Sequence, residues 1–274
     1  KTNFGYGAAA TYYILPSLQA KLSYEYAYRL PESVEMFGDG LIQQRNPDLK
    51  PESSRNVNFG LSYMQLVNVH QLSAEANFVY RHTKDFILKG VSLTSNPTTG
   101  YENLGNVLTK GVELGFRYGY KDLFHMGANF TYQDIIDNQE FEINKGSFVG
   151  EGITENITYK ERLPNIPYLF ANGDMGLRFH NILRRNSVLT LDYNLGYIHQ
   201  YYLSFPGLGA KSSKKVIPEQ FSHDLALGYS MDNGKYGVVV ECTNLTDRKL
   251  YDNYRLQKPG RAFNVKLRYF FNKK

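Results

Sequence analysis

Six histidines are the side chains of this sequence best suited to bind a metal or a haem iron, because neutral imidazole is a common metal ligand. Three fall at expected short turns and three near strand ends on an apolar side: His70, His125 and His180, then His82, His199 and His223. Imidazoles at the boundary of an apolar face satisfy their polar atoms in water. A haem ligand would need a loop or an interior position, so we expect no metal site here.

A loop that combines aromatic rings with ammonium groups is the second candidate for chemistry. Such a loop suits an anionic, aromatic ligand, since cations and ring faces attract their partners together. The same composition is equally typical of a loop at a membrane interface, and the sequence leaves both interpretations open. The candidate ligand-binding residues are Tyr201, Tyr202, Phe205, Lys211, Lys214 and Lys215.

Catalytic and nucleic-acid signatures are missing from the sequence. There is no HExxH pattern, no serine elbow and no phosphate-binding loop. Cys242 is the only cysteine, which excludes an intrachain disulfide and a thiolate cluster. The net charge is +5 and basic runs are short, so no nucleic-acid surface is indicated. We expect no enzyme activity, no cofactor and no nucleic-acid partner.

The elements that position these residues are β-strands. Apolar and polar residues alternate with period two over 18–29, which separates three charges from an apolar, aromatic face. No run of 18 apolar residues exists, so a membrane-spanning helix is excluded. Eleven segments show the strand pattern: 4–15, 18–29, 55–66, 71–88, 107–120, 124–136, 168–180, 187–202, 220–231, 235–245 and 261–271.

The two parities of these strands differ in charge. The apolar parity carries no charge at mid-strand, where Arg or Lys facing lipid would cost about 2–4 kcal/mol. The opposite parity carries charges of both signs four to six residues apart, which we expect to pair with each other and to solvate the wall of a lumen. These pairs are Glu25 with Arg29, Glu75 with Arg81, Glu113 with Arg117, and Asp174 with Arg178.

The connections alternate between short and long. Short turns are expected at 16–17, 67–70, 121–123, 181–186 and 232–234, and long loops at 30–54, 89–106, 137–167, 203–219 and 246–260. Short periplasmic turns with long outer loops mark an outer-membrane barrel, whereas a soluble β-sandwich would not sort its loops this way. The fold class is therefore all-β, an antiparallel transmembrane barrel segment of about eleven strands, half of a barrel of about twenty-two.

Several ordered motifs resemble the barrel of TonB-dependent outer-membrane receptors. The strongest is the string Asn46, Pro47, Asp48, Leu49, Lys50, Pro51 and Glu52. Others are Leu30-Pro31-Glu32, Lys110-Gly111-Val112-Glu113-Leu114, Leu163-Pro164-Asn165-Ile166-Pro167, Asn244-Leu245-Thr246-Asp247 and the terminal Tyr269-Phe270-Phe271, although Lys266 stands where the terminal signal usually has glycine. The likeness spans nearly the whole chain.

The resemblance implies a twenty-two-strand barrel with an N-terminal plug and a TonB box, coupled to the TonB–ExbB–ExbD complex of the inner membrane. Residues 1–274 would be its C-terminal part, without the plug and the first half of the barrel. The chain begins at Lys1, which we interpret as mature or truncated material. The lumen charges would then also dock the plug. The expected surroundings are outer-membrane lipid of a Gram-negative bacterium, with a surface lipoprotein as an optional partner.

The string at 46–52 has two interpretations. Pro47 and Pro51 restrict the backbone and Asp48 caps a turn, which favours a structural loop. Contact with the ligand through Lys50 or Glu52 is the alternative.

Four functions remain open at this point. The first is active import of an iron chelate, either a siderophore or haem, and the second is import of a glycan, cobalamin or a peptide. The third is a passive porin or structural barrel, and the fourth, disfavoured by the missing catalytic motifs, is a barrel enzyme. In each importer we expect the loops 30–54, 137–167 and 203–219 to select the ligand.

Overall fold

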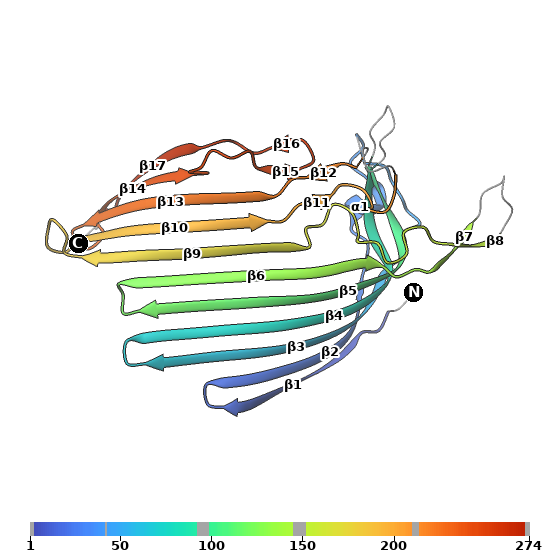
Figure 1. Ribbon diagram of the computed structural model, residues 1–274, viewed down its shortest axis with the longest axis horizontal. Coiled ribbons are helices and arrows are strands. Elements are labelled where there is room, and N and C mark those ends of the chain that lie inside the picture. The colour runs from blue at the N-terminus through green and yellow to red at the C-terminus, as the bar shows by residue number, and fades with distance from the viewer. Residues whose placement is uncertain (1–2, 42, 92–98, 145–151, 210–213, 272–274) are drawn as a thin grey trace.

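Eleven antiparallel strands form one sheet in the order β1-β2-β3-β4-β5-β6-β9-β10-β13-β14-β17 (Figure 1). The computed structural model describes residues 3–41, 43–91, 99–144, 152–209 and 214–271. The strands confirm the eleven predicted segments. Their bounds are β1 Tyr6–Leu15, β2 Leu18–Arg29, β3 Glu52–Val67, β4 His70–Val91, β5 Thr99–Tyr120, β6 Phe124–Asp137, β9 Leu169–His180, β10 Val188–Ile198, β13 Gln220–Met231, β14 Tyr236–Thr243 and β17 Ala262–Tyr269.

Short additional elements lie within the long connections. They are a five-residue helix and three two-stranded hairpins: α1 Ser33–Phe37, β7 Phe141–Asn144 with β8 Gly152–Glu155, β11 Tyr201–Tyr202 with β12 Val216–Ile217, and β15 Tyr251–Asn253 with β16 Leu256–Gln257. In the part of the chain that the structure describes, no helix is long and apolar enough to cross a membrane.

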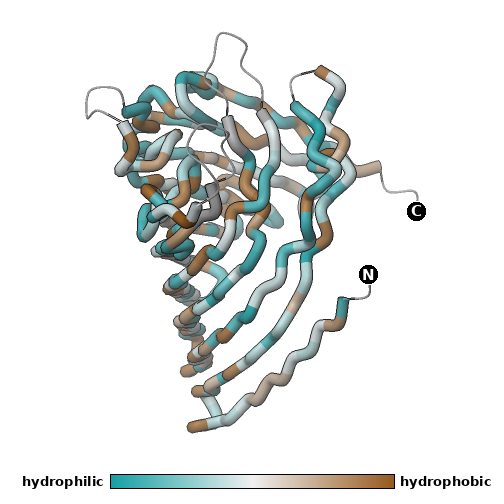
Figure 2. The backbone as a smooth tube through the Cα atoms, turned by 90° about the vertical axis from the view of Figure 1, so that its right-hand side faces the viewer, coloured by the Kyte–Doolittle hydropathy of each residue, from teal (hydrophilic) through white to brown (hydrophobic). Residues whose placement is uncertain are grey.

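The register gives the sheet two chemically distinct faces. Residues directly opposite one another on neighbouring strands point to the same side. One row joins Leu22, Phe59, Phe78, Val112 and Tyr132 across five strands. The adjacent row joins Lys21, Gly60, Asn77, Glu113 and Thr131. We call these sides the apolar face and the polar face, and the hydropathy colours of Figure 2 alternate along the strands accordingly.

The apolar face has no covering layer within the described residues. Phe78 is 48% exposed and Leu227 is 49% exposed, although both lie on this face in strands that have a neighbour on each side. The fully buried apolar side chains lie instead toward the loops, as at Val107 and Ile217. A soluble sandwich would pack a second sheet on such a face, so an exposed apolar sheet requires lipid or another apolar partner.

Short and long connections lie at opposite ends of the strands, as predicted. In Figure 1 the tight turns are at the left, and the long connections with their added elements are at the right. Asn68, Lys121, Asn181 and Asp232 adopt positive φ at the tight turns, which asparagine and aspartate tolerate better than most residues. We call the two ends the turn end and the loop end.

Three predicted boundaries were wrong. The loop expected at 89–106 is largely strand, since β4 and β5 pair as far as Val91 with Thr99. β3 begins at Glu52, within the loop expected at 30–54. β10 ends at Ile198 instead of continuing to Tyr202, because Tyr201 and Tyr202 pair with β12 in a separate small sheet. Cross-strand pairing, which a single strand's pattern does not reveal, sets all three limits.

Candidate functional site

The segment 46–52 is fastened to the β4–β5 hairpin at the loop end. The Asn46 side-chain amide donates to the Tyr101 carbonyl at 2.8 Å, and the Asn46 backbone amide donates to the Met36 carbonyl at 2.8 Å. The Asp48 amide donates to the Asn46 side-chain oxygen at 3.3 Å, so the Asn46 side chain caps the turn, not that of Asp48 as predicted. Leu49 is only 7% exposed. Asn46 therefore holds both α1 and β5 to the loop.

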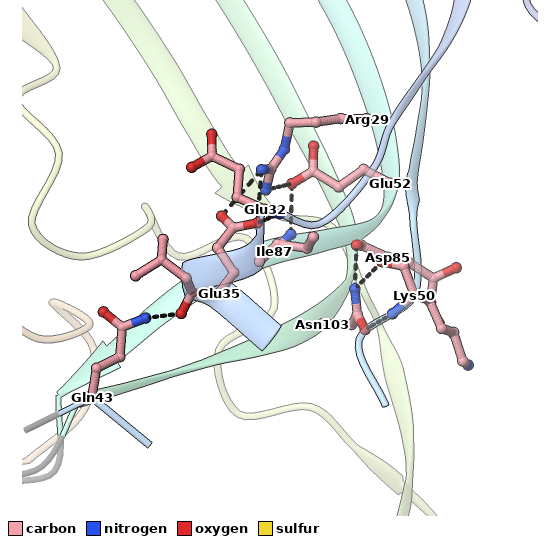
Figure 3. Close-up of polar contacts among 10 residues, drawn as sticks. Arg29, Glu32, Glu35, Gln43, Lys50, Glu52, Asp85, Ile87 and Asn103 are labelled. Atoms are coloured by element: carbon pink, nitrogen blue, oxygen red, sulfur yellow. Dashed lines mark hydrogen bonds and ion pairs between the residues drawn. The ribbon is translucent and has the colours of Figure 1, made fainter. Parts of the chain in front are cut away.

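Asn103 of β5 completes this attachment (Figure 3). Its side-chain oxygen accepts the Lys50 backbone amide at 2.8 Å, and its amide group donates to the carbonyls of Lys50 at 3.0 Å and Asp85 at 2.7 Å. The Lys50 side chain is 72% exposed and lies 3.9 Å from the Asp85 carboxylate. The backbone of Lys50 is thus structural, while its ammonium group stays accessible.

Glu52 is also structural. Its Oε1 accepts hydrogen bonds from Arg29 Nη2 at 3.0 Å and from the Ile87 amide at 2.7 Å. Arg29 Nη1 reaches Glu35 of α1 at 3.0 Å, and Glu35 in turn accepts the Glu32 amide at 2.8 Å. The two carboxylates are 9% and 12% exposed. We call Arg29, Glu35, Glu52 and Ile87 the clamp, and its geometry favours the structural interpretation of Glu52.

The predicted same-strand ion pairs do not form. Arg29 binds Glu35 and Glu52 rather than Glu25. Glu25 accepts from the Asn56 side chain at 3.2 Å, and Arg81 Nε donates to the same Asn56 at 2.8 Å. Residues four to six apart on a strand lie about 14–20 Å apart along it. The charged side chains therefore meet partners on neighbouring strands, which lie closer than the residues four to six positions away on the same strand.

Arg178 of β9 forms its ion pair at the turn end of the sheet, with Asp122 of the connection between β5 and β6. Its guanidinium lies 2.9 Å from Asp122 Oδ1, and His180 Nε2 lies 2.8 Å from Asp122 Oδ2. The His180 hydrogen bond, followed by the charge of Arg178, holds the pKa of the Asp122 carboxyl below its usual value. This cluster joins the turn between β5 and β6 to the end of β9.

Four of the predicted wall charges have no partner among the described residues. They share the polar face, and no hydrogen bond or ion pair joins their side chains to the rest of the described chain: Glu75, Glu113, Arg117 and Asp174. Gly115 lies opposite Glu75, and Gly127 lies between Arg117 and Asp174. Glycine has no side chain that could bond to these charges, so within the described residues they remain unpaired on the polar face.

The predicted ligand-binding loop is only partly brought together. Tyr201 is 6% exposed, and burial raises the pKa of its phenol. Lys214 Nζ lies 5.8 Å from the Tyr202 ring centroid, whereas Lys215 lies over Tyr254 at 5.9 Å. Phe205 is half-buried, and Lys211 lies outside the described residues. Tyr202 and Lys214 are therefore the pair that the structure places together, and Tyr201 is a packing residue.

A pocket of about 260 Å³ adjoins this loop. It is lined by residues of two long connections, including Lys160, Arg162, Tyr168, Gln200, Tyr201 and Tyr202. The Arg162 guanidinium stacks 4.0 Å from the Tyr168 ring centroid and binds Asp134 at 2.5 Å. Burial lowers the pKa of Arg162, but the hydrogen bond and the charge of Asp134 outweigh this and raise it. Lys160 and Arg162 were missed from the sequence; the neighbouring Leu163–Pro167 motif was their only signal.

Comparison with known families decides which kind of barrel this sheet belongs to. A family model described as "TonB dependent receptor-like, beta-barrel" matches residues 1–245. The chain belongs to the TonB-dependent receptor β-barrel family. The eleven-strand sheet, with its sorted faces and loops, is thus a portion of a receptor barrel.

Solved TonB-dependent receptors share the fold at low identity. The siderophore receptor PirA from Acinetobacter baumannii is 17% identical with a TM-score of 0.67, over 98% of this chain and 41% of that one. The copper transporter OprC is 17% identical with a TM-score of 0.68, over 97% of this chain and 39% of that one. The ferric yersiniabactin uptake receptor FyuA from Yersinia pestis is 16% identical with a TM-score of 0.62, over 95% of this chain and 35% of that one. The receptor chain thus spans about two fifths of such proteins. No curated protein matches it.

Proposed function

We propose that this chain is the C-terminal barrel portion of an outer-membrane TonB-dependent importer, and that its cargo is an iron chelate, either a siderophore or haem. The observation that carries the proposal is the two-faced, eleven-strand sheet with all its long loops at one end. Residues of such a barrel wall face lipid on one side and an aqueous lumen on the other. The family match and the siderophore and iron names of several structural neighbours support the choice of cargo.

The sheet edges support further strands in the whole receptor. β1 and β17 each have one neighbouring strand in the sheet. An unpaired strand edge in hydrocarbon costs several kcal/mol for each unsatisfied backbone group. We infer that other strands of the same barrel pair with both edges, which agrees with eleven strands as half of twenty-two.

The free charges of the polar face support a plug inside the lumen. Glu75, Glu113, Arg117 and Asp174 carry both signs and lack partners among the described residues. A buried charge requires a partner of opposite sign or water. A plug that docks on them and moves on coupling to the TonB–ExbB–ExbD complex would supply such partners reversibly.

The loop end supports recognition of an anionic cargo. Lys160 lines the small pocket, Lys214 lies over the ring of Tyr202, which also lines it, and Lys215 lies over the Tyr254 ring. No ion pair engages these three lysines within the described residues. A pocket of about 260 Å³ falls below the range of about 300–1,000 Å³ that encloses drug-sized ligands. We infer that this chain supplies one wall of a larger binding site. The proposed activity is transport, with no catalytic step.

The experiment is an uptake assay in the native bacterium with the gene deleted and then restored. Cells are supplied with radiolabelled iron as a ferric siderophore or as haem, and separately with cobalamin and an oligosaccharide. Deletion should abolish uptake of one iron chelate, and a proton uncoupler should do the same in the wild type. Loss of cobalamin or oligosaccharide uptake with normal iron uptake would contradict the proposed cargo.

A further inference from the structure

The apolar face carries three cations near the loop end. Arg55, Lys84 and Lys110 are exposed and lie on β3, β4 and β5, which are neighbours in the sheet. Arg55 pairs with His82, and Lys84 lies two residues beyond His82 on the same face. Lys110 pairs with Tyr80, two residues before His82. Strands lie about 4.8 Å apart and residues about 3.4 Å apart along a strand, so the backbones of Arg55 and Lys84 are about 8 Å apart and that of Lys110 is about 12–14 Å from both. We call these three cations the basic patch.

The basic patch has no internal counter-charge. Among the described residues no ion pair involves any of its three members. The carboxylate nearest to it by register is Asp134, opposite Lys110, and that carboxylate binds Arg162 at 2.5 Å. Two cations of the polar face, Arg29 and Arg178, do have a carboxylate partner.

The patch lies at the height where a membrane's polar head groups begin. On β3 the apolar face runs from Gln65 through Tyr63, Leu61, Phe59 and Val57 to Arg55. Ten residues at about 3.4 Å each, on a strand tilted by about 40°, rise about 26 Å. The apolar band of a transmembrane barrel is about 25 Å tall, so Gln65 and Arg55 mark its two boundaries.

Aromatic side chains border the patch in the arrangement of a membrane interface. Tyr26, which pairs with Arg55, is hydrogen-bonded to Tyr28 through their hydroxyls at 3.0 Å, and Tyr80 is 49% exposed. Tyrosines concentrate where hydrocarbon meets head groups. A cation cluster at this level faces the acidic groups of lipids rather than bulk solvent.

We propose that the basic patch binds the phosphate groups of a phosphorylated glycolipid in the outer leaflet. This inference rests on the outer-membrane location proposed above. A guanidinium binds phosphate through two parallel hydrogen bonds, and ammonium groups add point charges on flexible stems. Three cations on adjacent strands suit a lipid that carries more than one phosphate on a rigid sugar. The bound lipid would seal the barrel wall beside the β4–β5 hairpin.

The test uses the full-length receptor in detergent, with native mass spectrometry to count bound lipid A. The patch variant carries Arg55→Ser, Lys84→Ser and Lys110→Ser, and the control carries Lys21→Ser, Arg81→Ser and Arg117→Ser on the polar face. Removing three near-surface charges should lower lipid A occupancy about tenfold or more, while the control stays within about twofold. Wild-type receptor should prefer phosphorylated to dephosphorylated lipid A.

Equal lipid A retention by the patch variant and the wild type would overturn the proposal. Displacement of lipid A by inorganic phosphate at equal concentration would overturn the lipid assignment, because the site would then recognise phosphate alone. Heat-dependent gel migration checks that each variant is folded. Chelate uptake separates the two proposals: a receptor that binds lipid A through the patch but imports no chelate contradicts the proposed function alone.

Discussion

Replacing Glu52 by alanine should open the loop end locally, and the clamp gives the magnitude. The Arg29–Glu52 ion pair is worth about 1 kcal/mol, because Arg29 is 40% exposed and solvent screens it. The Ile87 amide loses its acceptor at a residue that is 6% exposed, which costs about 1–3 kcal/mol. The combined loss of about 2–4 kcal/mol corresponds to at least about a thirtyfold change in local opening.

Hydrogen exchange at the Ile87 amide of the full-length receptor is the assay. Glu52→Ala should speed this exchange about thirtyfold or more, and Glu52→Gln, which keeps an acceptor, about fivefold. Lys50→Ala is the matched control, because that ammonium group is 72% exposed and only loosely placed near Asp85. Unchanged Ile87 exchange in Glu52→Ala would refute the assignment of Glu52 as a structural residue.

Three further predictions concern the loops and the turn end. Replacing Lys211, Lys214 and Lys215 by serine should weaken an anionic chelate by roughly 1–3 kcal/mol and flatten its salt dependence; calorimetry at two ionic strengths measures both, and unchanged binding would contradict the loop assignment. Gly38→Ala should destabilise the loop by about 1–3 kcal/mol, since φ is 71° and an added Cβ would clash with the Gln43 carbonyl; proteolysis of the loop at the wild-type rate would contradict this. The lowered pKa of Asp122 means that its contribution is present above its unfolded value of about 3.9 and is lost as pH falls through the folded value; Asp122→Asn should abolish that acid sensitivity in hydrogen exchange of the 121–123 turn, and an unaltered pH profile would contradict it.

The strands were predictable because the period-two pattern is local. The segment predicted at 18–29 is β2 itself, Leu18–Arg29, where every second residue is apolar or aromatic. The face assignment was also predictable, since charge is missing from the mid-strand positions of one parity. The register confirmed it by pairing Leu22 with Phe59 and Leu191 with Leu227.

The site was less predictable because its contacts join distant segments. Arg29 meets Glu52 across 23 residues, and Asn103 meets Lys50 across 53. Sequence spacing suggested Glu25 as the partner of Arg29, yet Glu25 lies four residues away, about 14 Å along the same strand. The buried position of Tyr201 also depended on its pairing with Ile217 of β12, which its aromatic character alone did not reveal.

Lipid accessibility of the two faces tests the central claim most directly. Spin labels are placed in the full-length receptor, in outer-membrane vesicles, at Leu61, Leu191 and Leu267 on the apolar face and at Glu113 and Asp192 on the polar face. A lipid-soluble quencher should relax the first three labels strongly and the last two weakly. Equal quenching of both sets would contradict a transmembrane barrel wall, and with it the proposed importer.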